Sequence, residues 1–256
     1  MKNINISSDL NDNSIKIVEL NKPELKNAFN PEMISEITET FQNISQDKTV
    51  RAVILKGAGT AFCAGADLNW MKSMVDFSFE QNIKDSEKLW DMFEAIILCE
   101  APVIGLIHGA AFGGALGLIA ACDYVIADGA TKYCFSEVKL GLSPAVISAF
   151  ILRKCADSQV RPYMLNAEVF DSQTAQRLGL VHIIKNADDG LTEARKFSGL
   201  GLEAIRETKK LLNNIENSKS AKSWAEQKKL TTTVISERRM SKEGQERLKG
   251  FLNKTK

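Results

Sequence analysis

Two short stretches of small residues could present main-chain donors to a reacting oxygen. Residues 62–68 read FCAGADL and residues 112–118 read FGGALGL, each between a predicted buried strand and a predicted helix. The first N–H groups of a helix lack an intrahelical acceptor and lie at the positive end of its dipole, so such junctions suit a developing oxyanion. Small side chains also let a carbonyl group approach the backbone closely. The same glycines could serve only tight strand–helix packing, and the residues alone leave both interpretations open.

One acidic side chain is a candidate proton carrier. Glu137 lies between apolar segments in YCFSEVKLGLSP, where a buried carboxyl could act as a base. The alternative is a solvated carboxylate paired with Lys139. The two histidines, His108 and His182, lie in apolar strand-like segments and are expected to be core residues with satisfied hydrogen bonds.

Other familiar chemistries find little support. Gly57-Ala-Gly59 follows a predicted strand, but Phe62 stands where a dinucleotide fingerprint needs its third glycine. The chain contains no GxxxxGK[ST], GxSxG, HExxH or CxxC motif, so P-loop, nucleophile-elbow and histidine–metal chemistry are not indicated. The five cysteines are odd in number and lie in apolar surroundings, which favours buried thiols in a reducing compartment over disulfides.

Composition indicates an ordinary globular protein of 256 residues. Thirty-three basic and 32 acidic residues leave a formal net charge of +1, which suggests neither a nucleic-acid nor a membrane partner. The amino-terminal residues lack an apolar signal region, and no apolar run reaches membrane-spanning length. We therefore expect a soluble, cytoplasmic protein.

The hydrophobic pattern predicts an α/β fold. Strands are expected at 3–8, 14–20, 51–57, 102–109, 123–128 and 180–184, and helices at 30–44, 82–100 and 113–121. Asn30 and Pro31 suit the N-cap and first helical position of the earliest helix. From about residue 188 the chain is helical and highly charged. We expect an α/β core over 1–187 and an α-helical region over 188–256.

The order of these segments resembles the crotonase superfamily of enoyl-CoA hydratases and isomerases. The matching stretches are NKPELKNAFN, RAVILKGAGTAFCAGADLNWM, PVIGLIHGAAFGGALGLIAACDYVIA, YCFSEVKLGLSPAVIS, AQRLGLVHII and SERRMSKEGQERLKGFLNK, which together span nearly the whole chain. The resemblance implies a crotonase-like ββα-spiral core with a C-terminal helical trimerisation region. The motifs GADLNWMKSM and FSEVKLGLSPAVIS are most similar to those of hydratases of the methylglutaconyl-CoA type, which act in leucine and branched isoprenoid catabolism.

The resemblance also implies roles for individual residues. The N–H groups of Ala66 and Gly114 would hold the thioester oxygen of an acyl-CoA, with Glu137 as the acid and base. Gly114 would be small because the substrate lies against it. Substrate-binding positions would be Lys26, Ala28, Ala64, Asp67 and Leu68 beside the adenine and pantetheine portions, Gly117 beside the acyl chain, and Phe251 and Lys254 at the nucleotide end, in the same or a neighbouring subunit. Phe112 and Gly113 would also contact the substrate.

One position departs from the family pattern. Two-base hydratases carry a glutamate three residues past the oxyanion glycine, where this chain has Gly117. Glu137 could pass a single proton in both directions, another acid could stand in, or the reaction could be a double-bond shift, which needs one base. Gly117 would also free volume beside the acyl chain.

Three functions therefore fit these residues. They are hydration of a 2-enoyl-CoA, Δ3–Δ2-enoyl-CoA isomerisation by Glu137 alone, and acyl-CoA binding with little turnover. No cofactor is expected beyond the coenzyme A of the substrate, and the family implies a homotrimer or a dimer of trimers.

Overall fold

The computed structural model describes residues 1–219 and 224–254. Its strands are β1 (Ile4–Ser8), β2 (Ile15–Leu20), β3 (Ala52–Gly57), β4 (Val103–Ile107), β5 (Ala110–Phe112), β6 (Tyr124–Ala127), β7 (Lys132–Cys134), β8 (Phe170–Asp171) and β9 (Ile183–Ile184). Its α-helices are α1 (Pro31–Gln46), α2 (Leu68–Ser73), α3 (Phe79–Leu98), α4 (Ala115–Ala121), α5 (Ala145–Lys154), α6 (Asp157–Asn166), α7 (Ser172–Leu178), α8 (Ala187–Arg195), α9 (Leu202–Lys219), α10 (Trp224–Met240) and α11 (Lys242–Lys254). Four 3₁₀ helices complete the described elements: η1 (Pro23–Leu25), η2 (Met74–Asp76), η3 (Glu137–Leu140) and η4 (Lys196–Gly199).

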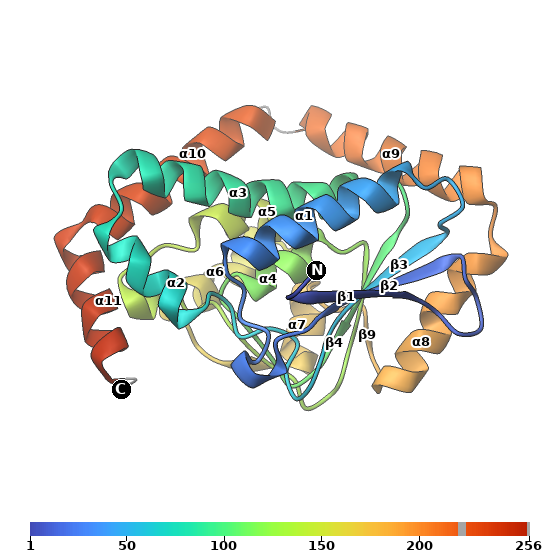
Figure 1. Cartoon of the computed structure of the whole chain (residues 1–256), viewed down its shortest axis with the longest axis horizontal. Coiled ribbons are helices and arrows are strands. Elements are labelled where there is room, and N and C mark those ends of the chain that lie inside the picture. The colour runs from blue at the N-terminus through green and yellow to red at the C-terminus, as the bar shows by residue number, and fades with distance from the viewer. Residues whose placement is uncertain (220–223, 255–256) are drawn as a thin grey trace.

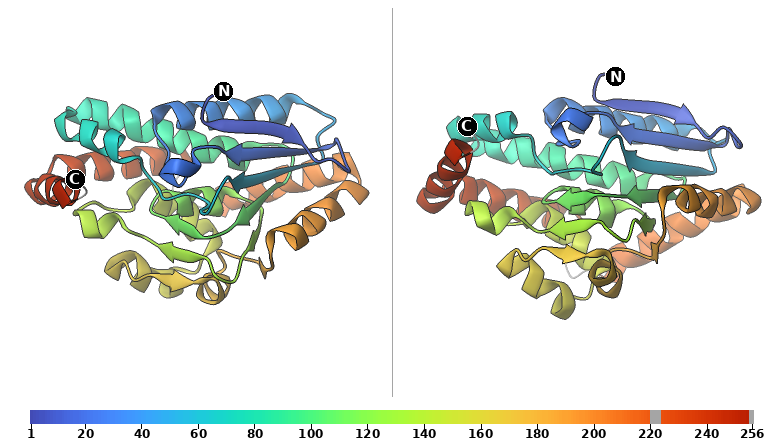
Figure 2. Two further views of the ribbon diagram at one scale, coloured as in Figure 1. Left: turned by 60° about the horizontal axis from the view of Figure 1, so that its bottom comes forward. Right: turned by 90° about the horizontal axis from the view of Figure 1, so that it is seen from below.

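Two sheets form the centre of the fold. The larger has the order β1-β2-β3-β4-β6-β9, antiparallel between β1 and β2 and parallel from β2 onward. The smaller has the order β5-β7-β8. Figure 2 shows the strands stacked roughly in chain order, from blue through green to yellow. The strand–helix alternation expected from the sequence is confirmed.

Local sequence signals account for the helices that cover the larger sheet. The Asn30 side chain accepts a hydrogen bond from the N–H of Met33 at 2.9 Å, and Pro31 is the first residue of α1, as predicted. Helix α3 begins slightly earlier than predicted because Ser78 and Gln81 form a capping box. Both helices bury an apolar stripe, and they pack side by side over the sheet (Figure 1).

The C-terminal helices pack on the core of their own chain. Helix α10 packs against α3 and α5, and α11 packs against α2 and η3. The expected boundary between 187 and 188 falls at the start of α8, which itself packs against β4 and β6. The helical character of this region is confirmed, whereas its status as a separate domain stays a prediction.

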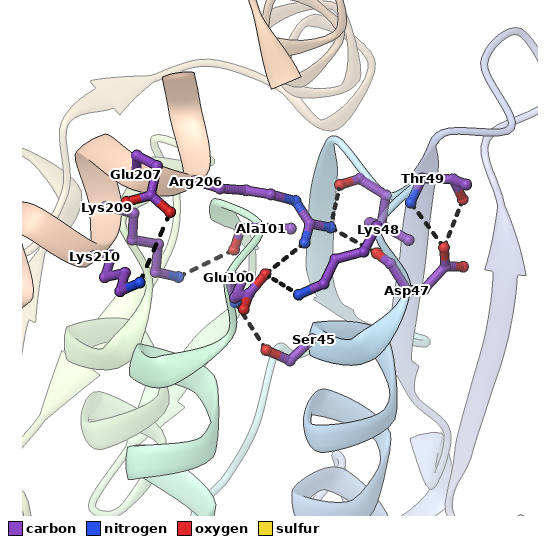
Figure 3. Close-up of polar contacts among 11 residues, drawn as sticks. Ser45, Asp47, Lys48, Thr49, Glu100, Ala101, Arg206, Glu207, Lys209 and Lys210 are labelled. Carbon is purple, nitrogen blue, oxygen red and sulfur yellow. Dashed lines mark hydrogen bonds and ion pairs between the residues drawn. The ribbon is translucent and has the colours of Figure 1, made fainter. Parts of the chain in front are cut away.

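Two buried cations, Arg206 and Lys209, link α9 to the core through hydrogen bonds and ion pairs. The guanidinium of Arg206 donates to the carbonyls of Asp47 and Val50 and to the carboxylate of Glu100 (Figure 3). Lys209 donates to the carbonyl of Ala101 and pairs with Asp123 at 2.7 Å. Two of these acceptors, the carbonyls of Val50 and Ala101, belong to buried residues and need such donors.

Candidate active site

Three loops that are far apart in the sequence meet at one edge of the fold. The N–H of Phe29 donates to Gly65 at 2.8 Å, and the carbonyl of Phe29 accepts from Asp67 at 3.0 Å. On the other side, the N–H of Phe112 donates to the carbonyl of Cys63 at 3.2 Å. The stretch FCAGADL is therefore held between residues 26–29 and residues 110–114.

Glycine is required where two of these loops touch. Gly65 and Gly113 have φ angles of +92° and +55°, which side chains other than glycine rarely adopt. A Cβ at Gly65 would lie 2.7 Å from the carbonyl oxygen of Phe112. The two small-residue turns singled out in the sequence are thus in direct contact.

The N–H groups of Ala66 and Gly114 are left without acceptors. Their neighbours are engaged, since Gly113 donates to Cys134 at 2.9 Å and the Phe29 bonds lie on either side of Ala66. Within the described part of the chain, neither Ala66 nor Gly114 donates a main-chain hydrogen bond to any group. Both residues line the same cavity, so the N–H groups are available there.

Glu137 lies in the wall of that cavity, at the first position of η3. Its Oε2 is buried and has no hydrogen-bond partner among the described residues. Burial raises the pKa of this carboxyl from 4.5 to about 7. A Cβ built at Gly113 would lie 3.6 Å from Oε1, which places the carboxylate beside the glycine turn. The alternative of an ion pair with Lys139 is wrong, because the Lys139 ammonium contacts the sulfur of Cys134 instead.

The cavity has a volume of about 440 Å³ and a mainly apolar wall. Eight of the predicted site residues line it: Ala64, Ala66, Leu68, Phe112, Gly113, Gly114, Glu137 and Phe251. Phe251 comes from α11 of the same chain, so the C-terminal helix closes its own cavity. The side chain of Lys254 lies outside the described residues.

Three of the residues predicted to lie beside the adenine and pantetheine portions do not line the cavity. The carboxylate of Asp67 caps α2 by accepting from the N–H groups of Asn69 and Trp70. Lys26 is exposed, and its carbonyl accepts from Ala64 at 2.9 Å, while Ala28 is buried. Their contacts with coenzyme A remain predictions.

The expectation about Gly117 is wrong, and Gly114 has a second reason to be small beside its predicted contact with the substrate. Gly117 does not line the cavity, and a Cβ there would lie 2.5 Å from Cζ of Phe93 and 2.9 Å from Cγ2 of Ile147. The space of the missing glutamate is thus filled by the core rather than freed for an acyl chain. A Cβ at Gly114 would lie 2.5 Å from Cζ of Phe29. The Phe29 ring alone therefore requires a small residue at position 114.

Asn27 shapes these loops and was not predicted from the sequence. Asn27 is fully buried with φ +55°, and its side chain accepts from the N–H of Lys22 and donates to the carbonyls of Ala58 and Ala61. An asparagine is tolerated in this backbone conformation, and it lies within NKPELKNAFN. Nothing else in the local sequence indicated its partners.

The histidines and cysteines behave as structural residues, but the expectation that both histidines lie in the core is wrong, since His182 is exposed and His108 is partly exposed. His182 Nδ1 accepts from the N–H of Val125 at 2.9 Å, and partial desolvation lowers the pKa of its imidazole to about 4. His108 contacts the carbonyl of Gly59 through Nε2. All five cysteines are free and buried, as expected. Across residues 1–219 and 224–254, no three His, Cys, Asp or Glu side chains form a cluster suited to a metal ion. Over the same ranges, no helix is both long and apolar enough to cross a bilayer.

Comparison with known proteins assigns the chain to a family. The family model described as enoyl-CoA hydratase/isomerase matches residues 11–256. The chain is 34% identical over 197 residues to a probable enoyl-CoA hydratase of Mycobacterium tuberculosis, covering 77% of this chain and 75% of that protein. It is 35% identical over 172 residues to an enoyl-CoA hydratase of Alternaria alternata, covering 67% of this chain and 56% of the fungal protein.

A solved structure extends the similarity to the whole fold. An enoyl-CoA hydratase from Shewanella pealeana superposes with a TM-score of 0.80 at 34% identity, covering 98% of this chain and 94% of that one. The chain therefore belongs to the enoyl-CoA hydratase/isomerase family, within the crotonase superfamily. The resemblance stated from the sequence is confirmed, as is the crotonase-like fold.

Proposed function

We propose that this protein adds water across the double bond of a 2-enoyl-CoA, with Glu137 as the only carboxylate in the reaction. The observation that carries the proposal is the buried, unpartnered Oε2 of Glu137 in the same cavity as the unengaged N–H groups of Ala66 and Gly114. A proton carrier and two donors for an oxyanion are the parts that hydration through an enolate requires.

The reaction balances with one carboxylate. Ionised Glu137 takes a proton from water as the water oxygen bonds to C3, and the π electrons move onto the thioester oxygen. The N–H groups of Ala66 and Gly114 stabilise that enolate, and loss of one such donor typically costs about 3 kcal/mol in the transition state. Glu137 then delivers its proton to C2. Its pKa of about 7 suits both steps, because neither protonation state is strongly favoured at neutral pH.

One observation favours isomerisation as a second candidate. Among the described residues that line the cavity, Glu137 is the only one with a carboxyl group, and the place of a second glutamate is filled by Phe93 and Ile147. Moving a double bond from C3 to C2 needs one base, which removes a proton from C2 and returns it to C4. The same enolate and the same donors would serve.

The two activities are separable with purified protein. Loss of enoyl absorbance from crotonyl-CoA or 3-methylglutaconyl-CoA, with incorporation of solvent oxygen, supports hydration. Conversion of a 3-enoyl-CoA to the conjugated thioester without oxygen uptake supports isomerisation. Absence of hydration with both substrates and with longer 2-enoyl chains would refute the first proposal. If the protein turns over neither substrate class but still binds acyl-CoA, its function is acyl-CoA binding.

Glu137→Gln is the matched test of mechanism. It keeps the side-chain volume but removes the proton carrier, so we expect most activity to be lost while acyl-CoA binding, measured by calorimetry, persists. Equal activity in the variant would exclude Glu137 as the acid and base.

The finer properties inferred from the family are part of the same proposal. We propose a branched substrate of the methylglutaconyl-CoA type, no cofactor beyond coenzyme A, a cytoplasmic location, and a homotrimer or a dimer of trimers. Light scattering of the purified protein measures its mass, and activity after exhaustive chelation and dialysis tests the absence of a cofactor.

A further inference from the structure

A buried arginine lines the cavity at a distance along the chain from the glycine turns. Arg239 belongs to α10, and its side chain is 7% exposed. It lies in the wall of the cavity together with apolar residues of three helices, among them Met74, Ile235 and Leu248. A guanidinium in such a wall needs hydrogen-bond acceptors, because a buried polar group without partners is costly.

One edge of the Arg239 guanidinium is fully engaged. Its Nη1 donates to Oδ2 of Asp85 at 3.0 Å and lies 3.4 Å from Oγ of Ser86. The other oxygen of Asp85 accepts from Nε1 of Trp70 at 3.0 Å. Asp85 on α3 thus links Arg239 on α10 to Trp70 on α2, and both of its oxygens are used.

The opposite edge has no acceptor. Nε of Arg239 is buried without a hydrogen-bond partner, and Nη2 donates to no group among the described residues. Nε and Nη2 form the planar pair of donors that binds a carboxylate through two parallel hydrogen bonds. Arg206 also has a buried Nε without a partner, but of these two arginines only Arg239 lines the cavity. Joining α10 to α3 needs only the contact with Asp85, so the unused edge of Arg239 is left for a ligand of the cavity.

The charges of the wall favour an anion. The ionisable side chains with charge that line the cavity are Glu137, Lys139 and Arg239. Lys139 is exposed and its ammonium contacts the sulfur of Cys134, whereas Arg239 is buried and keeps a donor without a partner. The one carboxylate of the wall is half protonated near neutral pH, since its pKa is about 7. Asp85 offsets part of the charge of Arg239 from behind the wall.

We propose that Arg239 binds a carboxylate at the far end of the substrate's acyl group, so that the preferred substrate is an enoyl thioester of a dicarboxylic acid. This inference rests on the proposed function, since it takes the cavity of Glu137 as the acyl site. 3-Methylglutaconyl-CoA, the substrate type that the sequence motifs indicate, belongs to this class. Arg239 supports a dicarboxylic substrate independently of those motifs. Arg239 is a specificity-determining residue in this scheme and takes no part in proton transfer.

The test compares two substrates of the same shape. Glutaconyl-CoA ends in a carboxylate, and 5-methylhex-2-enoyl-CoA replaces that carboxylate with an isopropyl group. We expect the parent protein to have at least a tenfold higher kcat/KM for glutaconyl-CoA. Arg239→Lys retains a charge for Asp85 but loses the paired donors, and it should reduce that preference at least tenfold. Lys139→Met, which removes the other cation of the wall, is the matched control and should keep the preference.

Several outcomes would overturn the proposal. It is wrong if the parent treats both substrates alike, if Arg239→Lys lowers both kcat/KM values equally, or if the preference is lost in Lys139→Met alone. Because Arg239 also contacts Asp85, circular dichroism and thermal unfolding of the lysine variant must match the parent. If the lysine variant unfolds, Asp85→Asn is tested in its place. This change keeps the donor pair of Arg239, so the preference for glutaconyl-CoA should remain. Loss of that preference in Asp85→Asn counts against the proposal.

Failure of the proposed function gives a different result. If the parent converts neither substrate, the binding of glutaryl-CoA and 5-methylhexanoyl-CoA, the saturated counterparts, is compared by calorimetry. At least tenfold tighter binding of glutaryl-CoA by the parent, reduced in Arg239→Lys, would support the role of Arg239 without turnover. Equal binding of the two thioesters would refute it.

Discussion

The buried carboxyl of Glu137 should make the stability of the folded protein depend on pH. Its pKa lies at about 7 in the folded protein, against 4.5 for an ordinary glutamate, because burial disfavours the charged form. Between those values the folded state binds more protons than the unfolded chain. Stability is therefore lost as the pH rises through this window, and the full cost of about 3 kcal/mol is reached above pH 7.

Glu137→Gln removes this dependence, because glutamine does not titrate. Relative to the parent, the variant should gain about 2.5 kcal/mol of unfolding free energy between about pH 5 and about pH 8. Urea unfolding of both proteins at several pH values measures the difference. The informative quantity is the change with pH in the difference between the two unfolding free energies. The difference at a single pH also contains the effect of replacing a carboxyl with an amide.

A matched control separates burial from the loss of a charge. Glu207→Gln removes a carboxyl on α9 that is 72% exposed, and its unfolding free energy should follow that of the parent across the pH range. If the curves for Glu137→Gln and the parent also run parallel, Glu137 is not held in a desolvated site, and its assignment as a proton carrier loses its physical basis.

Three further changes test the loops and the packing around the site. In a Phe29→Leu background, which relieves the contact at position 114, Gly114→Pro should lower kcat about 100-fold or more relative to Gly114→Ala, because proline lacks the N–H while fitting the φ of −55°. Gly117→Ala should cost about 1–3 kcal/mol in urea unfolding, because its Cβ would press on Phe93. Arg206→Met should cost about 1–3 kcal/mol in the same assay, because the carbonyl of the buried residue Val50 would lose its donor.

Each of these three changes has its own control and its own contrary result. Equal kcat for the alanine and proline variants at position 114, with the fold intact, would remove the main-chain donor from the mechanism. Gly250→Ala lies in α11 with no atom within 4 Å of the new Cβ and should not destabilise the protein. Lys210→Met removes a cation that is 67% exposed and should leave stability nearly unchanged. A similar loss in either control would show that the larger effects are not specific to packing or anchoring.

Several features could be predicted because they depend on neighbours in the sequence. Asn30 followed by Pro31 starts a helix wherever an apolar stripe follows, and β3 and β4 are apolar runs that fit a sheet covered on both sides. The glycine turns at 65 and 113 were visible for the same reason, since a positive φ is a local demand on the residue. The order of these segments was enough to indicate the family.

Packing partners could not be predicted in this way. Gly114 and Gly117 were assigned to the substrate, but the atoms that exclude a side chain at these positions belong to Phe29, Phe93 and Ile147. No local pattern specifies which aromatic ring fills a given space. Arg239 stands in a charge-rich segment that resembles a solvated helix face, and only the packing of α10 on α3 places it opposite Asp85.

The sequence by itself determined the elements, the two glycine turns and the identity of the single candidate acid, because backbone conformation and side-chain chemistry are properties of short stretches of chain. The tertiary structure alone decided that Glu137 is buried without a partner, that the N–H groups of Ala66 and Gly114 remain unengaged, and that Arg239 shares their cavity. Burial and pairing are relations between distant segments. They are set by which surfaces pack together, and here they raise the pKa of an ordinary glutamate to about 7, as its proposed role as a proton carrier requires.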